Sequence, residues 1–194
     1  MKHYGPEDIE NYYPERSFDQ SEGWQRAEEA AKQTQRFLPN DFPGFMTRKT
    51  GGSTYCYTDT GERTPFVSYR VYYSIRGFES PPLDRYFTTD YDSLKTAWQN
   101  QGFDNIREWT SGPNDEEKSI EADRPDGVHL WYTAGPEYGV GLTIQTGCMR
   151  AVEGFEEEYI PPLDSVNREG DKVGSKWREE ADEHHGTKLE EENE

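Results

Sequence analysis

The stretch VSYRVYYSI, residues 67–75, contains the clearest strand pattern in the chain. Its bulky side chains alternate with smaller or charged ones at period two, which is typical of a β-strand with one buried face. Tyr72 falls on the opposite face, together with Ser68, Arg70 and Ser74. The predicted core face consists of Val67, Tyr69, Val71, Tyr73 and Ile75. The sequence therefore predicts a long strand packed on one side against a hydrophobic core.

Two segments flanking this strand have the periodicity of amphipathic helices. We place the first at residues 22–38, with Ser21 as the N-cap and Pro39 after its last turn. Its apolar face consists of Trp24, Ala27, Ala31, Thr34 and Leu38. The second helix begins near Asp90 and ends before Gly102. Its apolar face consists of Tyr91, Leu94, Ala97 and Trp98, and we expect both helices to pack on the same sheet.

Further short strands follow from alternating or apolar runs separated by turn residues. They are predicted at 53–59, 103–110, 119–123, 128–133 and 139–148, with residues 40–52 as a loop. The short turns between the last strands favour a meander. The predicted fold class is therefore α+β, with an antiparallel sheet of about five to six strands covered on one face by two helices.

Composition limits the size of the core and indicates which parts lie outside it. Leu, Ile, Val and Phe supply only 29 of 194 residues, and the net charge is −18. Residues 151–194 carry −10 of that charge, and such a segment buries too little apolar surface to offset its chain entropy. We therefore expect a flexible segment at 1–20, a single α+β domain at 21–164 and a disordered acidic tail at 165–194.

Charge and hydropathy also exclude some classes of partner. Nucleic-acid binding requires basic patches, so the strongly acidic chain argues against it. No apolar run approaches the ~18 residues of a membrane-spanning helix. We accordingly expect no nucleic-acid partner and no transmembrane segment, and a monomer.

The chain has two cysteines, Cys56 and Cys148. Cys56 lies in the first predicted strand of the core, and Cys148 lies in the last one. Buried free thiols would be ordinary at such positions. A disulfide would join the ends of the core and would stabilise a domain with few aliphatic side chains. We favour the disulfide, which implies an oxidising compartment.

Several short motifs between Trp24 and Arg150 occur in one order. They are GGSTYC at 51–56, a helix with Leu94, Trp98, Gly102 and Phe103, the element Asp126-Gly127-x-x-Leu130, and Thr146-Gly147-Cys148. In this layout the chain resembles small cell-envelope proteins of actinobacteria, many of them lipoproteins of unassigned function. The resemblance implies an α+β fold with paired cysteines, and it supplies no catalytic residues. It implies an extracellular or cell-envelope location, with a signal or anchor outside this sequence; the cytoplasm is the alternative.

No residue pattern predicts catalysis, a metal or a cofactor. His184 and His185 lie beside acidic residues, but in a segment that we expect to be disordered and so without preorganised geometry. His129 fits a solvated strand face, and Ser53 lacks the surroundings of a nucleophile. Pairs among 39 acidic residues arise by coincidence. The sequence therefore assigns no catalytic, metal-binding or cofactor-binding residue.

Aromatic residues are the remaining candidates for a binding site. Tyr72, Trp109 and Trp131 could line an exposed platform for a glycan or a peptide. The alternative is that such rings replace missing Leu and Ile in the core or shield the outer face. We expect a non-catalytic domain that binds a protein or an envelope component. The other interpretations are an intracellular accessory protein with an acidic partner-binding tail and, less favoured, a small hydrolase.

Overall fold

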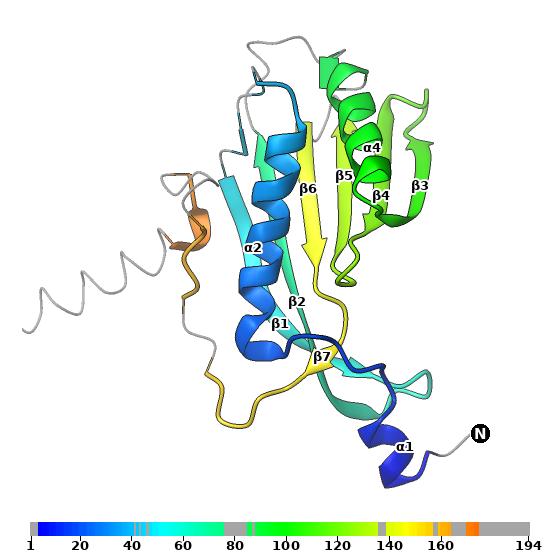
Figure 1. Ribbon diagram of the computed structural model, residues 1–194, viewed down its shortest axis with the longest axis vertical. Coiled ribbons are helices and arrows are strands. Elements are labelled where there is room, and N and C mark those ends of the chain that lie inside the picture. The colour runs from blue at the N-terminus through cyan, green and yellow to red at the C-terminus, as the bar shows by residue number, and fades with distance from the viewer. Residues whose placement is uncertain are drawn as a thin grey trace, which may run out of the picture.

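The computed structural model describes residues 4–40, 42, 44–45, 47–75, 85–86, 88–135, 139–156, 159–163 and 170–174. Its helices are α1 (Pro6–Glu10), α2 (Gln20–Phe37) and α4 (Thr89–Asn100). Its strands are β1 (Thr47–Tyr57), β2 (Arg63–Ile75), β3 (Asp104–Ser111), β4 (Glu117–Asp123), β5 (His129–Gly135), β6 (Gly139–Gln145) and β7 (Met149–Arg150). Figure 1 shows them as one sheet with helices packed against it.

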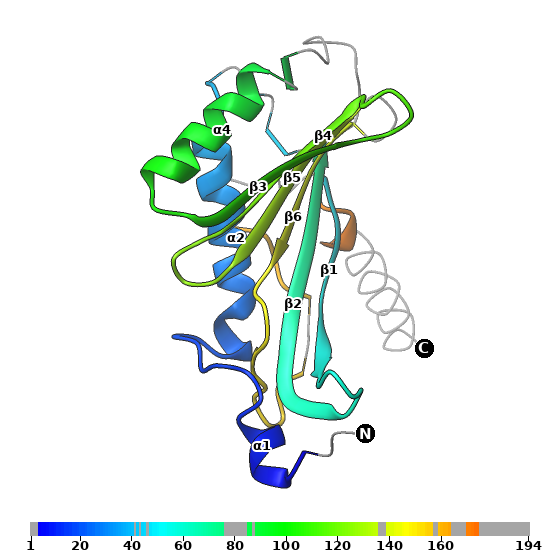
Figure 2. The ribbon, with the colours of Figure 1, turned by 90° about the vertical axis from the view of Figure 1, so that its right-hand side faces the viewer.

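All strand pairs are antiparallel, in the order β1-β2-β6-β5-β4-β3, and the two-residue β7 pairs with β2. The predicted mixture of helices with an antiparallel sheet is confirmed, with one more short strand than expected. Strands β3 to β6 form the predicted meander, because short turns connect neighbouring antiparallel strands. In Figure 2, α2 and α4 lie on the same side of the sheet.

The alternation predicted for residues 67–75 holds in β2 except at Ser74, which was expected on the exposed face and is buried. Val67, Tyr69, Val71, Tyr73 and Ile75 are all buried, whereas Arg70 is exposed. Helix α2 packs on β2 and β6, and α4 packs on β3 and β4. Trp98 of α4 is fully buried and stacks on Phe103, with ring centroids 5.8 Å apart. Aromatic rings thus supply much of the core volume that the scarce aliphatic residues cannot.

Strand β1 begins earlier than predicted. Residues 40–52 were expected to be loop, yet residues 47–52 belong to β1. A Cβ on Gly51 would lie 2.8 Å from the Tyr69 hydroxyl oxygen. The absence of a side chain at position 51 therefore allows the Tyr69 ring to pack closely on β1, and the glycine does not mark a turn.

Two other expectations need correction in detail. The N-cap of α2 is Asp19 instead of Ser21, and the Asp19 carboxylate accepts a hydrogen bond from the Ser21 N–H at 2.9 Å. Either residue type can cap a helix, so the sequence alone does not discriminate between them. Cys148 lies in the connection between β6 and β7, because β6 ends at Gln145.

Both flanks of the expected domain contain residues that contact the core. Tyr13 packs on Phe66 with ring centroids 5.5 Å apart and donates a hydrogen bond to the Tyr57 carbonyl at 2.6 Å. Asp171, in the segment 165–194 that we expected to be disordered, is buried. The described residues 170–174 therefore pack against the domain, whereas 165–169 and 175–194 lie outside the described residues. No helix in the described part of the chain is long and apolar enough to cross a membrane.

Candidate functional site

The face of the sheet opposite α2 and α4 carries all three aromatic residues proposed as a binding surface. Register pairs Tyr72 of β2 with Thr143 of β6, and Thr143 with Trp131 of β5. Cross-strand partners project from the same side of a sheet, so these three side chains share one face. Trp131 in turn pairs with Glu121 of β4. We call Tyr72, Trp109 and Trp131 the outer aromatic face.

Two members of the outer aromatic face touch each other. The ring centroids of Trp109 and Trp131 are 5.5 Å apart in a tilted arrangement. Trp131 is 37% exposed, which is high for so large an apolar side chain, and Trp109 is half-buried. These residues are 22 positions apart in sequence, and only the β3-β4-β5 register brings them together.

Tyr72 lies farther along the same face and covers part of β6. A Cβ on Gly141 would lie 2.5 Å from the Tyr72 hydroxyl oxygen, so the ring extends across β6 at this glycine. Gly141 pairs with Thr133 of β5. Tyr72 therefore points from β2 toward the strand that carries Trp131, with small residues between them.

Charged and polar side chains border the tryptophan pair. His129 lies between two carboxylates, with Nδ1 2.8 Å from Asp123 Oδ1 and Nε2 3.4 Å from Glu121 Oε2. Arg107 Nη2 lies 2.5 Å from the other oxygen of Glu121. Asn105 donates a hydrogen bond to Asp123 at 2.7 Å. These groups form a hydrogen-bonding margin along β3, β4 and β5.

The electrostatics of this margin keep Asp123 ionised. Burial raises the pKa of Asp123, but hydrogen bonds from Asn105 and His129 outweigh burial and leave that pKa below its ordinary value. A carboxylate with a lowered pKa is a hydrogen-bond acceptor and a poor general acid at neutral pH. Among the residues that the structure describes, no group of three or more His, Cys, Asp and Glu side chains could hold a metal ion.

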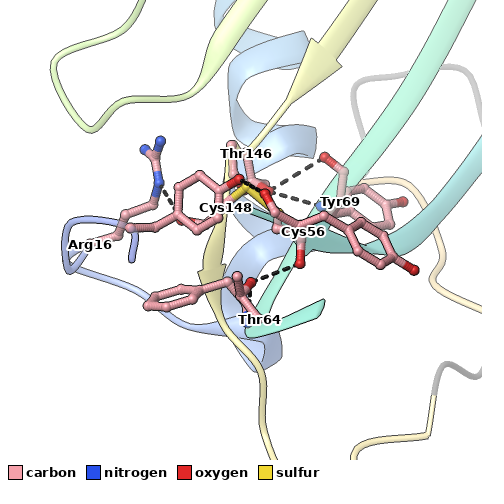
Figure 3. The surroundings of a disulfide bond; sticks show 10 residues. Arg16, Cys56, Thr64, Tyr69, Thr146 and Cys148 are labelled. Carbon is pink, nitrogen blue, oxygen red and sulfur yellow. Dashed lines mark hydrogen bonds between the residues drawn. A yellow bond between two sulfur atoms is a disulfide. The ribbon is translucent and has the colours of Figure 1, made fainter. Parts of the chain in front are cut away.

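Cys56 and Cys148 form a disulfide, with their Cα atoms 6.1 Å apart (Figure 3). The bond joins β1 to the β6–β7 connection, 92 residues away in sequence. Thr64 donates a hydrogen bond to the Cys56 carbonyl at 2.8 Å, and Arg16 Nε donates one to the Cys148 carbonyl at 3.1 Å. The predicted pairing is confirmed, and the N-terminal segment is attached to the same place through Arg16.

A buried ion cluster, not predicted from the sequence, joins three distant parts of the chain. Arg48 of β1 binds Glu28 of α2 at 2.9 Å and Asp171 at 2.8 Å, and all three side chains are at most 1% exposed. Tyr159 also donates a hydrogen bond to Asp171 at 2.8 Å. One readable signal existed, since Glu28 lies between Ala27 and Ala31 on the apolar face of its helix.

In the ion cluster, the pKa of Glu28 departs from its ordinary value. Burial raises the pKa of Glu28 above its ordinary value, although the charge and the hydrogen bond of Arg48 act in the opposite direction. Glu28 Oε2 has no hydrogen-bond partner among the described residues. The ion cluster contains one positive group, Arg48, and two carboxyl groups, Glu28 and Asp171. It links three segments of the chain, and its charges do not balance when both carboxyl groups are ionised.

Comparisons with known proteins give a limited result. No protein-family model matches the chain, and no curated protein matches it. A solved structure, a DUF4853 family protein from Actinomyces odontolyticus, is similar with a TM-score of 0.47 and 12% identity. The similarity covers 79% of this chain and 78% of that one.

Proposed function

We propose that this protein is a non-catalytic domain of the extracellular space or cell envelope that binds an envelope glycan through its outer aromatic face. The observation that carries the proposal is the contacting pair Trp109 and Trp131 on the sheet face opposite the helices, with Trp131 37% exposed. Exposed aromatic clusters on otherwise polar surfaces mark interaction sites.

The surroundings of the tryptophan pair favour a glycan as the ligand. A sugar ring has an apolar C–H face that can lie on an aromatic ring, and hydroxyl groups at its edge that need hydrogen-bond partners. Glu121, Asp123, His129 and Arg107 border the pair and supply both donors and acceptors. Tyr72 provides a second ring across β6 for a neighbouring sugar unit.

The disulfide supports the proposed compartment. Cys56–Cys148 is a structural bond that joins β1 to the β6–β7 connection, and disulfides of this kind persist in oxidising environments. The net charge of −18 over the whole chain is compatible with a domain exposed to the outside of the cell.

The proposal is tested by titrating the protein with soluble oligosaccharides from a muramidase digest of actinobacterial cell wall while following tryptophan fluorescence. We expect saturable quenching of tryptophan fluorescence in the wild type. The affinity should be about tenfold weaker in Trp131→Ala, because this variant lacks a central stacking ring. Tyr57→Ala is the matched control, because Tyr57 is 51% exposed at the end of β1 and outside this face.

Two results would count against glycan binding at this face. One is the absence of saturable quenching in the wild type. The other is an equal affinity of Trp131→Ala and Tyr57→Ala, both with wild-type circular dichroism. If the immobilised domain retains a protein and no oligosaccharide, the ligand of this face is a protein and the glycan proposal is wrong.

A further inference from the structure

A shallow cavity of about 540 Å³, open to solvent on the helix side of the molecule, is lined mostly by charged and polar side chains. It lies between α2, the residues that follow α4 and the turn between β4 and β5, and it is separate from the outer aromatic face. Arg26, Lys32 and Arg36 of α2 line one side, and Arg124 lines the other. Four cationic side chains therefore converge on one cavity in a chain whose net charge is −18.

The acidic residues in the lining do not balance these cations. Asp126 is bound to Arg124 through Arg124 Nε at 2.9 Å and Arg124 Nη2, and it also accepts a hydrogen bond from the Val128 N–H at 3.3 Å. Glu29 lies 4.0 Å from Arg26 with both side chains partly exposed, and pairs of this kind contribute little. The charges of Arg124 and Asp126 cancel, and the excess positive charge remains on α2.

Lys32 and Arg36 carry most of that excess. Neither forms an ion pair with another described residue. They are four positions apart on the same helix, where like charges repel each other. An anion bound between them would remove that repulsion.

Asp126 responds mainly to its ion-pair partner Arg124 and, to a smaller degree, to Arg26 of α2. Burial raises the pKa of this carboxyl, but the hydrogen bond from Arg124 and the charges of Arg124 and Arg26 outweigh burial and leave its pKa below the ordinary value. A negative group is therefore favoured at this position, chiefly by Arg124 and secondarily by Arg26.

We propose that this cavity is a binding site for a small multivalent oxyanion, with Arg26, Lys32 and Arg36 as its direct contacts. Arg26 and Arg36 are ten residues apart, which is about 15 Å along the helix, so a ligand that reaches both needs more than one charged group. Guanidinium groups bind phosphate and carboxylate oxygens in pairs, so both groups fit.

The remaining lining suits the rest of such a ligand. Gln101 offers an amide donor, and Phe103, which is buried against Trp98, provides an apolar wall. Arg124 is held in a fixed orientation by Asp126 and forms a hydrogen-bonding wall opposite α2, with its charge already balanced by that carboxylate.

The test is isothermal titration calorimetry of the full chain at low ionic strength with sodium pyrophosphate and, in a second arm, with citrate. We expect saturable binding of at least one probe, and the stronger one identifies phosphate or carboxylate as the preferred group. Arg36→Gln should weaken binding about tenfold, whereas Arg70→Gln removes the same charge from an exposed position on β2 and should change it less than about twofold.

Amide chemical-shift changes on adding the stronger probe should concentrate at Gln33, Gln101 and Phe103. The inference is overturned if neither probe binds saturably. It is also overturned if Arg36→Gln and Arg70→Gln weaken binding equally, because the effect would then be one of net charge alone. Both substitutions are at exposed side chains, so we expect the variants to remain folded. Melting temperatures equal to that of the wild type would verify this.

Discussion

Substitution of Asp171 by alanine should lower the free energy of unfolding much more than substitution of an exposed carboxylate does. Asp171 accepts hydrogen bonds from Arg48 Nε at 3.2 Å, Arg48 Nη2 at 2.8 Å, Tyr159 at 2.8 Å and the Val173 N–H at 3.0 Å. The Arg48 side chain is 1% exposed. Removing the carboxylate leaves Arg48 with Glu28 and the Ile160 carbonyl as its remaining partners in the cluster.

The magnitude follows from the burial of this pair. Removing one member of a buried ion pair costs about 3–5 kcal/mol, because the other charge stays desolvated. Glu28 still offsets part of the Arg48 charge, so we expect a loss near the lower limit, about 3 kcal/mol. That is a large share of the ~5–15 kcal/mol that stabilises a typical domain.

The assay is urea unfolding followed by tryptophan fluorescence. With an m-value of about 2 kcal/mol/M, a loss of about 3 kcal/mol lowers the midpoint by about 1.5 M. Glu153→Ala is the control, since Glu153 is an exposed carboxylate on the same C-terminal part of the chain, and it should change stability by less than about 0.5 kcal/mol. Equal urea midpoints for Asp171→Ala and Glu153→Ala would refute the conclusion that the contact of Asp171 with Arg48 stabilises the domain.

Three further predictions concern the core, the disulfide and pH. Trp98→Ala should cost about 3–5 kcal/mol in urea unfolding, because Trp98 is fully buried, whereas the exposed Gln99→Ala should be nearly silent; similar midpoints would contradict this. Replacing Cys56 and Cys148 together by serine should cost about 4–5 kcal/mol for a loop closed over 92 residues, and unreduced wild type should take up no alkylating agent by intact mass. The raised pKa of Glu28 means that its stabilising contribution is present below its ordinary pKa of 4.5 and is lost as pH rises through the raised value. Wild type should therefore lose stability relative to Glu28→Gln between pH 4 and pH 8 in paired thermal melts, and a difference that stays constant or changes in the opposite direction would exclude this assignment.

The helices, the central strand and the meander could be predicted because their signals are local. Alternation at residues 67–75 reports the two faces of one strand, and the buried positions of the helix around Trp98 repeat at helical spacing. Short turns between consecutive strands leave few topologies open. The Cys56–Cys148 pair was also predictable, since the chain has two cysteines, each near one end of the sheet-forming region.

Contacts between distant segments were decided only by the tertiary structure. Arg48 and Asp171 are 123 residues apart, and neither lies in a pattern that marks it as buried. Trp109 reaches Trp131 through the register of three strands, and a shift of one residue would have placed either ring on the opposite face. Arg124 joins the cations of α2 because the β4–β5 turn packs beside that helix. Sequence periodicity specifies which face of an element is buried, whereas register and packing specify which faces meet, and both candidate binding sites of this protein depend on the second kind of information.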